Sequence, residues 1–271
     1  MDVLEAFILG ILQGLTEFLP ISSSGHIEIG AFLLNLDPSD NLIFQLIVHA
    51  ATTLSTLVVF RKDIIGLFKD FFNRCWNESK VYVIKLLVSA IPLAFAGFFL
   101  EDYINELFAG RVVFIGSMFL ITALLLAMTH FNKGKGGEVT YGKAMVIGLS
   151  QALAILPGIS RSGSTIATAL LVGVDKYKAT RFSFLMILMP LIGASLLKFI
   201  EYLNNPAIAG NISGAAMITG FLAAFFSGWA SCVWMINLVK KGKLIWFSLY
   251  LVIVGVIAIV ILKSWSYYNT L

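Results

Sequence analysis

The sequence has few charged residues for its length. Only 13% of its 271 residues are Asp, Glu, Lys or Arg, whereas 59% are hydrophobic. A soluble globular domain carries about 25% charged residues, so this chain lacks the polar side chains that would cover a surface facing water. The composition therefore excludes an ordinary soluble domain and favours a single membrane domain over residues 1–271.

Cysteine is also scarce, and the first residues lack a basic cluster. The two cysteines, Cys75 and Cys232, indicate neither a disulfide framework nor a metal site. Asp2 and Glu5 stand where a signal peptide would carry basic residues, so we expect no cleaved leader. The net charge of +4 comes from loop residues, which in a membrane protein report orientation. We therefore expect a lipid bilayer and no nucleic acid as the partner.

Long apolar segments dominate the rest of the chain. Six of them reach the length of about 20 residues that crosses a bilayer core: 42–60, 81–100, 112–131, 182–200, 213–238 and 244–262. Residues 3–34 and 142–173 are also apolar but are interrupted by Pro, Gly and Ser. Irregular backbone is tolerated at membrane depth only inside protein or beside a wet cavity. We therefore predict that each interrupted segment is a re-entrant hairpin of two half-helices.

The distribution of basic residues predicts the orientation. Most of the 19 Lys and Arg residues fall in four segments, 61–80, 132–143, 173–181 and 239–243. The segments predicted on the opposite side, 24–41, 101–111, 201–212 and 263–271, contain only Arg111 and Lys263. Because basic loops stay in the cytoplasm, both termini are expected to face outward. This holds only if each hairpin returns to the side from which it enters.

The two interrupted segments resemble each other. Residues 6–26 and 144–164 align without a gap, which pairs Gln13 with Gln151, Ser22 with Ser160 and Ser24 with Ser162. Each half, 1–135 and 139–271, then holds one hairpin and three spans. Three spans reverse the direction of the chain, so we predict an all-α polytopic membrane protein with an inverted-topology repeat. The alternative is a duplicated helix bundle without a site.

The polar residues of the first break suit an anion. Gln13 and Glu17 are four residues apart and share one helix face. Pro20 then ends the half-helix, and Ser22, Ser23, Ser24, Gly25 and His26 open the next one. Serines cap helices well, and the N–H groups of a helix N-terminus attract phosphate.

The second break repeats this design and adds a cation. Ser160, Ser162, Gly163 and Thr165 surround Arg161. A charge at membrane depth is costly and indicates function. The guanidinium group of arginine can bind two phosphate oxygens at once through two N–H groups. Together the two breaks predict a phosphate or diphosphate site.

Several roles in this site remain open from the residues alone. Glu17, with Gln13 as a neutral ligand, could hold a divalent cation. Ser23 or water could attack phosphorus, and His26 could transfer protons or attack directly. The alternatives are a structural Glu17–Arg161 ion pair and an interhelical hydrogen bond from His26. His49 is predicted to make only a helix–helix contact.

The stretches 13–26 and 157–165 resemble the two signature motifs of bacterial undecaprenyl-diphosphate phosphatases, the bacitracin-resistance protein family. The resemblance extends over essentially the whole chain. It implies hydrolysis of undecaprenyl diphosphate, which recycles the lipid carrier for peptidoglycan, with Mg or Ca as the cofactor. Glu17, Ser23, His26 and Arg161 fall on the essential positions of the family. Many members carry Glu where this chain has Gln13, so Glu17 is expected to carry most of the metal binding.

An enzyme and a carrier remain the two hypotheses. Inverted repeats with broken helices are typical of transporters, so a polyprenyl-phosphate flippase is the alternative. Acid, base and nucleophile candidates in one place favour the enzyme. The expected location is the bacterial inner membrane, with the active site facing the periplasm. A homodimer is an option that the sequence does not decide.

Overall fold

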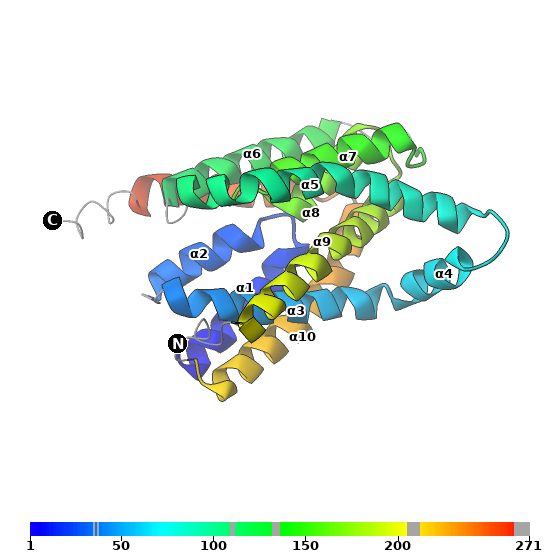
Figure 1. Ribbon diagram of the computed structural model, residues 1–271. Coiled ribbons are helices and arrows are strands. Elements are labelled where there is room, and N and C mark those ends of the chain that lie inside the picture. The colour runs from blue at the N-terminus through cyan, green and yellow to red at the C-terminus, as the bar shows by residue number, and fades with distance from the viewer. Residues whose placement is uncertain (35, 37, 109–111, 132–135, 205–211, 263–271) are drawn as a thin grey trace.

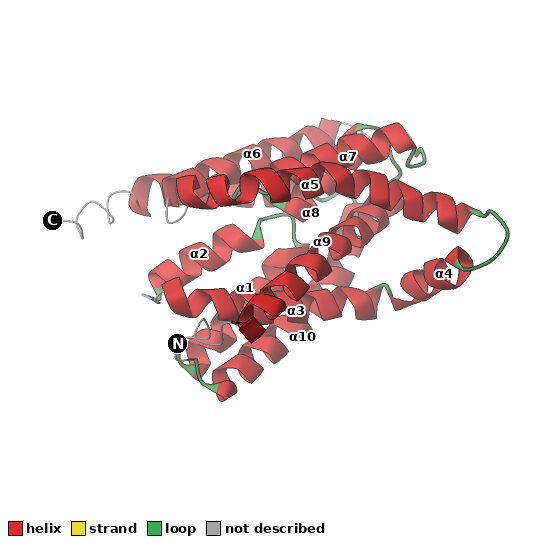
Figure 2. Ribbon diagram, viewed as in Figure 1, coloured by secondary structure: helices red, strands yellow, loops and turns green. Residues whose placement is uncertain are grey.

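The chain folds into helices. The computed structural model describes residues 1–34, 36, 38–108, 112–131, 136–204 and 212–262, and within these ranges it has no strand (Figure 2). The helices are α1 (Val3–Phe18), α2 (Ser23–Leu33), α3 (Pro38–Val59), α4 (Arg61–Phe71), α5 (Glu78–Phe108), α6 (Val112–Phe131), α7 (Tyr141–Leu153), α8 (Arg161–Leu171), α9 (Lys176–Asn204), α10 (Gly214–Lys240) and α11 (Ile245–Ile257), followed by a short π-helix, η2 (Ala258–Leu262). The predicted all-α class is confirmed.

The helices form two groups with one helix between them. In Figure 1, α5, α6 and α7 lie in the upper group, α1, α2, α3 and α10 lie in the lower group, and α9 crosses between them. The start of α1 and the red end of the described chain lie toward the left, and the loop from α4 to α5 lies at the right. The predicted tail 263–271 and the residues Arg111, Lys133 and Lys135 lie outside the described residues.

Both interrupted segments form pairs of short helices, as predicted. α1 ends at Phe18 and α2 begins at Ser23, while α7 ends at Leu153 and α8 begins at Arg161. Within each pair the two helices pack on each other. The polar breaks therefore lie between half-helices in both halves of the chain.

Each hairpin packs closely against a long helix of the other half. α1 packs chiefly against α10, and α7 packs chiefly against α5. A Cβ atom on Gly10 would lie 2.5 Å from the Gly220 carbonyl oxygen, and one on Gly148 would lie 2.3 Å from the Ser89 carbonyl oxygen. Small residues allow such backbone contacts between apolar helices. This packing holds both breaks in place.

Several predicted boundaries need correction. Residues 61–80 are predicted as a loop, yet α4 fills Arg61–Phe71, bent by 74° from the preceding helix. Its charged and apolar residues recur at helical spacing and form an amphipathic helix, which a count of charges does not detect. α5 and α9 also extend into the predicted external segments 101–111 and 201–212. The remainder of those two segments lies outside the described residues.

Fewer helices are long and apolar enough to span a membrane than the six spans predicted. Among the described residues, three helices are long and apolar enough to cross a membrane, or four if α3 and α4 form one bent span. These are in α5, α6 and α10, and α11 is shorter. The chain is thus a multi-pass membrane protein, while the spans predicted at 182–200 and 244–262 stay predictions.

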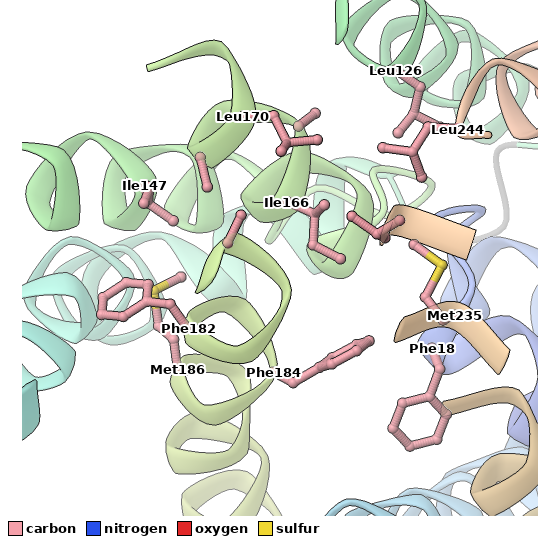
Figure 3. Packing of buried hydrophobic residues seen from close by; sticks show 14 of the residues in the cluster. Phe18, Leu126, Ile147, Ile166, Leu170, Phe182, Phe184, Met186, Met235 and Leu244 are labelled. Atoms are coloured by element: carbon pink, nitrogen blue, oxygen red, sulfur yellow. The ribbon is translucent and has the colours of Figure 1, made fainter. Parts of the chain in front are cut away.

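The largest apolar core lies beside the breaks. Phe18, at the end of α1, meets Phe184 of α9 edge to face at 5.8 Å between ring centroids (Figure 3). Ile166 of α8 and Met235 of α10 are fully buried in the same cluster. Close packing of such side chains makes this cluster rigid, and the cluster holds the ends of the half-helices that carry the polar residues.

Candidate functional site

The two breaks meet in the structure. The hydroxyl group of Ser162, in the first turn of α8, donates to the carbonyl oxygens of Glu17 at 3.3 Å and Leu19 at 3.2 Å. A Cβ atom on Gly163 would lie 3.1 Å from the Pro20 carbonyl oxygen. The second hairpin therefore satisfies carbonyl groups that the end of α1 leaves without helical partners.

Serine caps begin both inner half-helices. Ser22 Oγ accepts a hydrogen bond from the Gly25 N–H at 3.4 Å, and Ser160 Oγ accepts one from the Gly163 N–H at 3.0 Å. The predicted caps are thus confirmed. Because the Gly25 and Gly163 N–H groups already bond to these caps, their predicted role in binding phosphate competes with capping.

Ser22 has a strained backbone. Its φ of +71° makes it the one non-glycine residue with positive φ among the described residues. Such a conformation costs on the order of 1 kcal/mol or more. It persists because the packed elements on both sides fix the break, and it directs the next residues, Ser23 and Ser24, into a cavity.

Glu17 is the centre of the polar contacts. Its Oε2 atom accepts hydrogen bonds from Ser23 Oγ at 2.5 Å and Gln13 Nε2 at 3.0 Å. Its Oε1 atom lies 3.8 Å from Arg161 Nη2, and Oε2 lies 3.9 Å from His49 Nε2. The Glu17 side chain is only 7% exposed, whereas that of Arg161 is 27% exposed. A buried carboxylate thus faces a cation that still reaches the cavity.

A cavity of about 40 Å³ lies between the two breaks. It exceeds the roughly 10–15 Å³ that one water needs. Its polar lining contains seven of the predicted site residues: Glu17, Ser22, Ser23, Ser24, Ser160, Arg161 and Ser162. The opposite wall is apolar and comes chiefly from α9, with Phe184, Ile187, Leu188 and Leu191. The site is therefore amphipathic, with polar breaks facing an apolar helix.

The other predicted site residues do not line this cavity: Gln13, Gly25, His26, Gly163 and Thr165. Thr165 Oγ1 donates to the Arg161 carbonyl oxygen at 2.9 Å. This hydrogen bond lies within α8. A direct contact of Thr165 with phosphate stays a prediction.

His26 is held on another side of α2. Its Nδ1 atom lies 2.8 Å from the Ser22 carbonyl oxygen, and its Nε2 atom lies 2.8 Å from the Tyr250 hydroxyl of α11. The ring also stacks on Tyr250, with 5.7 Å between centroids. With Nδ1 donating to the carbonyl, Nε2 accepts from Tyr250. No sequence motif pointed to Tyr250, which belongs to the other half of the chain.

His49 makes a contact between helices, as predicted, and its partner is Glu17 of α1. Its Nδ1 atom lies 2.7 Å from the Gln45 carbonyl oxygen one turn earlier in α3, which leaves Nε2 on the side of Glu17. Thr56, on the same helix, lines the cavity. His49 and Thr56 are seven residues apart and share one face of α3, and this spacing was the sequence signal that both approach the site.

The donor set around Glu17 suits a cation that is shared with phosphate. No group of three or more His, Cys, Asp or Glu residues gathers within the described ranges. Gln13 is fully buried, and its Oε1 atom has no hydrogen-bond partner. One carboxylate and one amide oxygen are few ligands, but Mg²⁺ is commonly bound by one or two carboxylates together with substrate phosphates. The residues fit a cation of that kind.

Comparisons with known proteins identify the family of the chain. The family model described as bacitracin resistance protein BacA matches residues 6–257. The chain belongs to this family. An undecaprenyl-diphosphatase of Christiangramia forsetii is 47% identical over 96% of this chain and 98% of its own length. One from Bacteroides fragilis gives the same values, and undecaprenyl-diphosphatase 1 of Bacillus cereus is 35% identical over 96% and 98%. The BacA match includes both breaks.

Proposed function

We propose that this BacA family protein hydrolyses undecaprenyl diphosphate to undecaprenyl phosphate and inorganic phosphate. The names of its relatives support this activity. The observation that carries the proposal is Glu17, which bonds Ser23 and faces Arg161 at the meeting point of two broken helices. The product would recycle a lipid carrier for cell-wall synthesis, and the activity accounts for the bacitracin resistance in the family name.

The contacts support distinct roles for three side chains. Arg161 would bind phosphate oxygens and stabilise charge that develops in the transition state. Glu17 would accept the proton of Ser23 Oγ, or of a water in that position, as the oxygen attacks the terminal phosphorus. The bond to the bridging oxygen then breaks, and undecaprenyl phosphate leaves. Attack by water would release inorganic phosphate in the same step. Attack by Ser23 would leave the phosphoryl group on Ser23 Oγ, and a water would then hydrolyse that ester to inorganic phosphate. Ser23 and water both stay candidates for the nucleophile.

A divalent cation, Mg or Ca, belongs to this proposal. Glu17 would hold it, with Gln13 Oε1 as a neutral ligand after rotation of the amide. When bound, the ion would offset negative charge on the diphosphate. His26 is assigned a positioning role, because both of its ring nitrogens are engaged away from the cavity. A direct role for His26 in proton transfer stays a prediction.

The membrane arrangement is also proposed. Two of the helix pairs follow the repeat: α1 on α10 matches α7 on α5, and α6 packs on its counterpart α11. This supports an inverted repeat in which the two hairpins enter from opposite sides. With the basic segments in the cytoplasm, the termini and the site would face the periplasm. Single cysteines at residues 2 and 242, in a background without Cys75, test this: only the first should react with an impermeant reagent in intact cells.

Phosphate release tests the activity. Purified protein in detergent is given a C55 or a C15 prenyl diphosphate, with and without a chelator. We expect release from wild type, loss with the chelator, and recovery on addition of Mg²⁺ or Ca²⁺. No release from the wild type under any of these conditions would contradict the proposed function.

A further inference from the structure

A second, larger polar cavity lies away from the candidate active site. It has a volume of about 330 Å³ and lies where α4 turns back into α5, beside the start of α9. This end of α4 and α5 is at the right of Figure 1. It shares no lining residue with the cavity at the breaks. The proposed phosphatase activity does not use it.

Most charges in this cavity are paired. Arg181 Nη2 lies 2.7 Å from Asp63 Oδ1, and Lys178 forms an ion pair with Glu138. These pairs join α9 to α4 and to the loop before α7. They account for two of the three cations that line the cavity and leave it close to electrical balance.

Three groups remain available for a ligand. Lys85 Nζ lies over the ring of Tyr141 at 5.7 Å and forms no ion pair with a described residue. The buried hydroxyl of Tyr82 has no hydrogen-bond partner. Glu78 has no ion pair with any of the residues described and lies in the first turn of α5. An unpaired buried hydroxyl is unfavourable, so a ligand that accepts a hydrogen bond from it is favoured.

These groups match a head group that carries both charges. Phosphate oxygens can accept from the Lys85 ammonium and the Tyr82 hydroxyl, while an amine can donate to the Glu78 carboxylate. A purely anionic ligand would leave Glu78 facing a like charge. The mixture therefore favours a phosphate linked to a primary amine.

An apolar groove continues from this cavity. It has a volume of about 360 Å³, shares Leu67 with the polar cavity, and runs between α4, α5 and α9. Phe68 and Phe71 of α4 and Met189 of α9 line it. An amphipathic helix with exposed aromatic residues is typical of the membrane interface, and Phe68 is 66% exposed. A polar cavity joined to an apolar groove is the shape of a lipid site.

We infer that the polar cavity and the adjoining groove together bind an amine-bearing phospholipid of the phosphatidylethanolamine type. Its phosphate lies at Lys85 and Tyr82, its amine lies at Glu78, and one acyl chain fills the groove. The head-group cavity shares no lining residue with the diphosphate site, whereas the groove meets that site at Leu188. It would hold α4 against α5 and α9 at one membrane surface.

Lipid binding to the delipidated full-length protein tests this directly. Native mass spectrometry would be used to titrate phosphatidylethanolamine, phosphatidylglycerol and soluble phosphoethanolamine. We expect phosphatidylethanolamine to bind most tightly. Lys85→Gln should weaken its binding roughly tenfold, since it removes a charge-assisted hydrogen bond. Glu78→Gln should weaken the binding of phosphatidylethanolamine but not the binding of phosphatidylglycerol.

The matched control is Lys240→Gln. Lys240 Nζ also lies over a tyrosine ring, that of Tyr177 at 4.7 Å, but it does not line the cavity. This variant should bind lipid like wild type, and all three variants should retain their phosphate release, which checks that they fold. Equal lipid binding by wild type and Lys85→Gln would overturn the inference, as would a preference for phosphatidylglycerol or equal binding of free phosphoethanolamine. Displacement of the lipid by a C15 prenyl phosphate would assign the groove to the substrate tail and would also overturn it.

Discussion

The first and second breaks share a backbone design but carry different chemistry. Both begin their inner helix with a serine cap, and both place a second serine 3.3 Å from the capping hydroxyl. The position after the cap is Ser23 in the first break and Arg161 in the second. Glu17 precedes the first break, where the aligned residue of the second is Ile155.

The comparison indicates how the two copies of a duplicated element can acquire separate roles. The shared serines and glycines build the helix ends, and helix ends need the same residues in either copy. A nucleophile candidate and a phosphate-binding cation, by contrast, must come from opposite sides of one cavity. Substitutions that exchange or remove the differing residues therefore test the comparison.

Removal of the carboxylate should have the largest effect. Glu17→Gln retains the shape of the side chain but cannot accept a proton from Ser23, so we expect kcat for phosphate release to fall roughly 10²–10⁴-fold. Glu28→Gln is the control, because Glu28 belongs to the same hairpin and does not line the cavity. A Glu17→Gln variant that retains more than a tenth of the wild-type kcat would contradict the proposed role of Glu17 as proton acceptor.

Conversion of the second break into the first should have the next largest effect. Arg161→Ser supplies the residue found at the equivalent position of the first break, and we expect kcat/KM to fall about 10²-fold because a transition-state cation is lost. Arg161→Lys should recover part of the loss, since it restores the charge without the paired donors. Arg61→Ser, at the start of α4, is the control. Equal kcat/KM for Arg161→Ser and wild type would mean that the two breaks are interchangeable.

The sequence predicts the breaks better than the faces of their helices. Pro20 and the serines act locally, so the ends of the half-helices follow from them. The partnership of Glu17 with Arg161 is a tertiary contact, and the internal repeat was the signal for it. The side of α2 that His26 occupies depends on packing against Tyr250, far along the chain. The helix contact of His49 was predicted, but its partner Glu17 was not, because the approach of α3 to α1 is a tertiary property. Its proximity to Glu17 had no local signal beyond its place on α3.

The position of His26 provides a smaller test. If His26 acts by holding the start of α2, Tyr250→Phe should lower kcat a few-fold, in line with the roughly 1 kcal/mol of one hydrogen bond. His26→Gln should have a larger effect of the same kind, and the pH profile of kcat should keep its shape in both variants. Loss of one limb of that profile in His26→Gln alone would show that His26 transfers protons.

A carboxylate at position 13 should strengthen cation binding. Gln13 Nε2 lies 3.0 Å from Glu17 Oε2, so Gln13→Glu would place two carboxylates side by side. Divalent cations bind more tightly as the number of charged oxygen ligands rises. We expect a several-fold lower Kd for Mn²⁺, measured by electron paramagnetic resonance without substrate. Gln151→Glu, at the aligned position of the second hairpin, is the control, and an equal decrease in both variants would refute a cation site at the first break.

The smallest effect separates two serines that align in the repeat. Ser162 donates to two carbonyl groups of the first hairpin, whereas the hydrogen bond of Ser24 reaches only Ser22. Ser162→Ala should therefore lower the free energy of unfolding by about 1 kcal/mol, and Ser24→Ala should change it by less than about 0.5 kcal/mol. Reversible unfolding in mixed micelles measures both. Equal losses would mean that contact between the breaks does not stabilise the fold, and the two hairpins would then be joined only through the long helices against which each one packs.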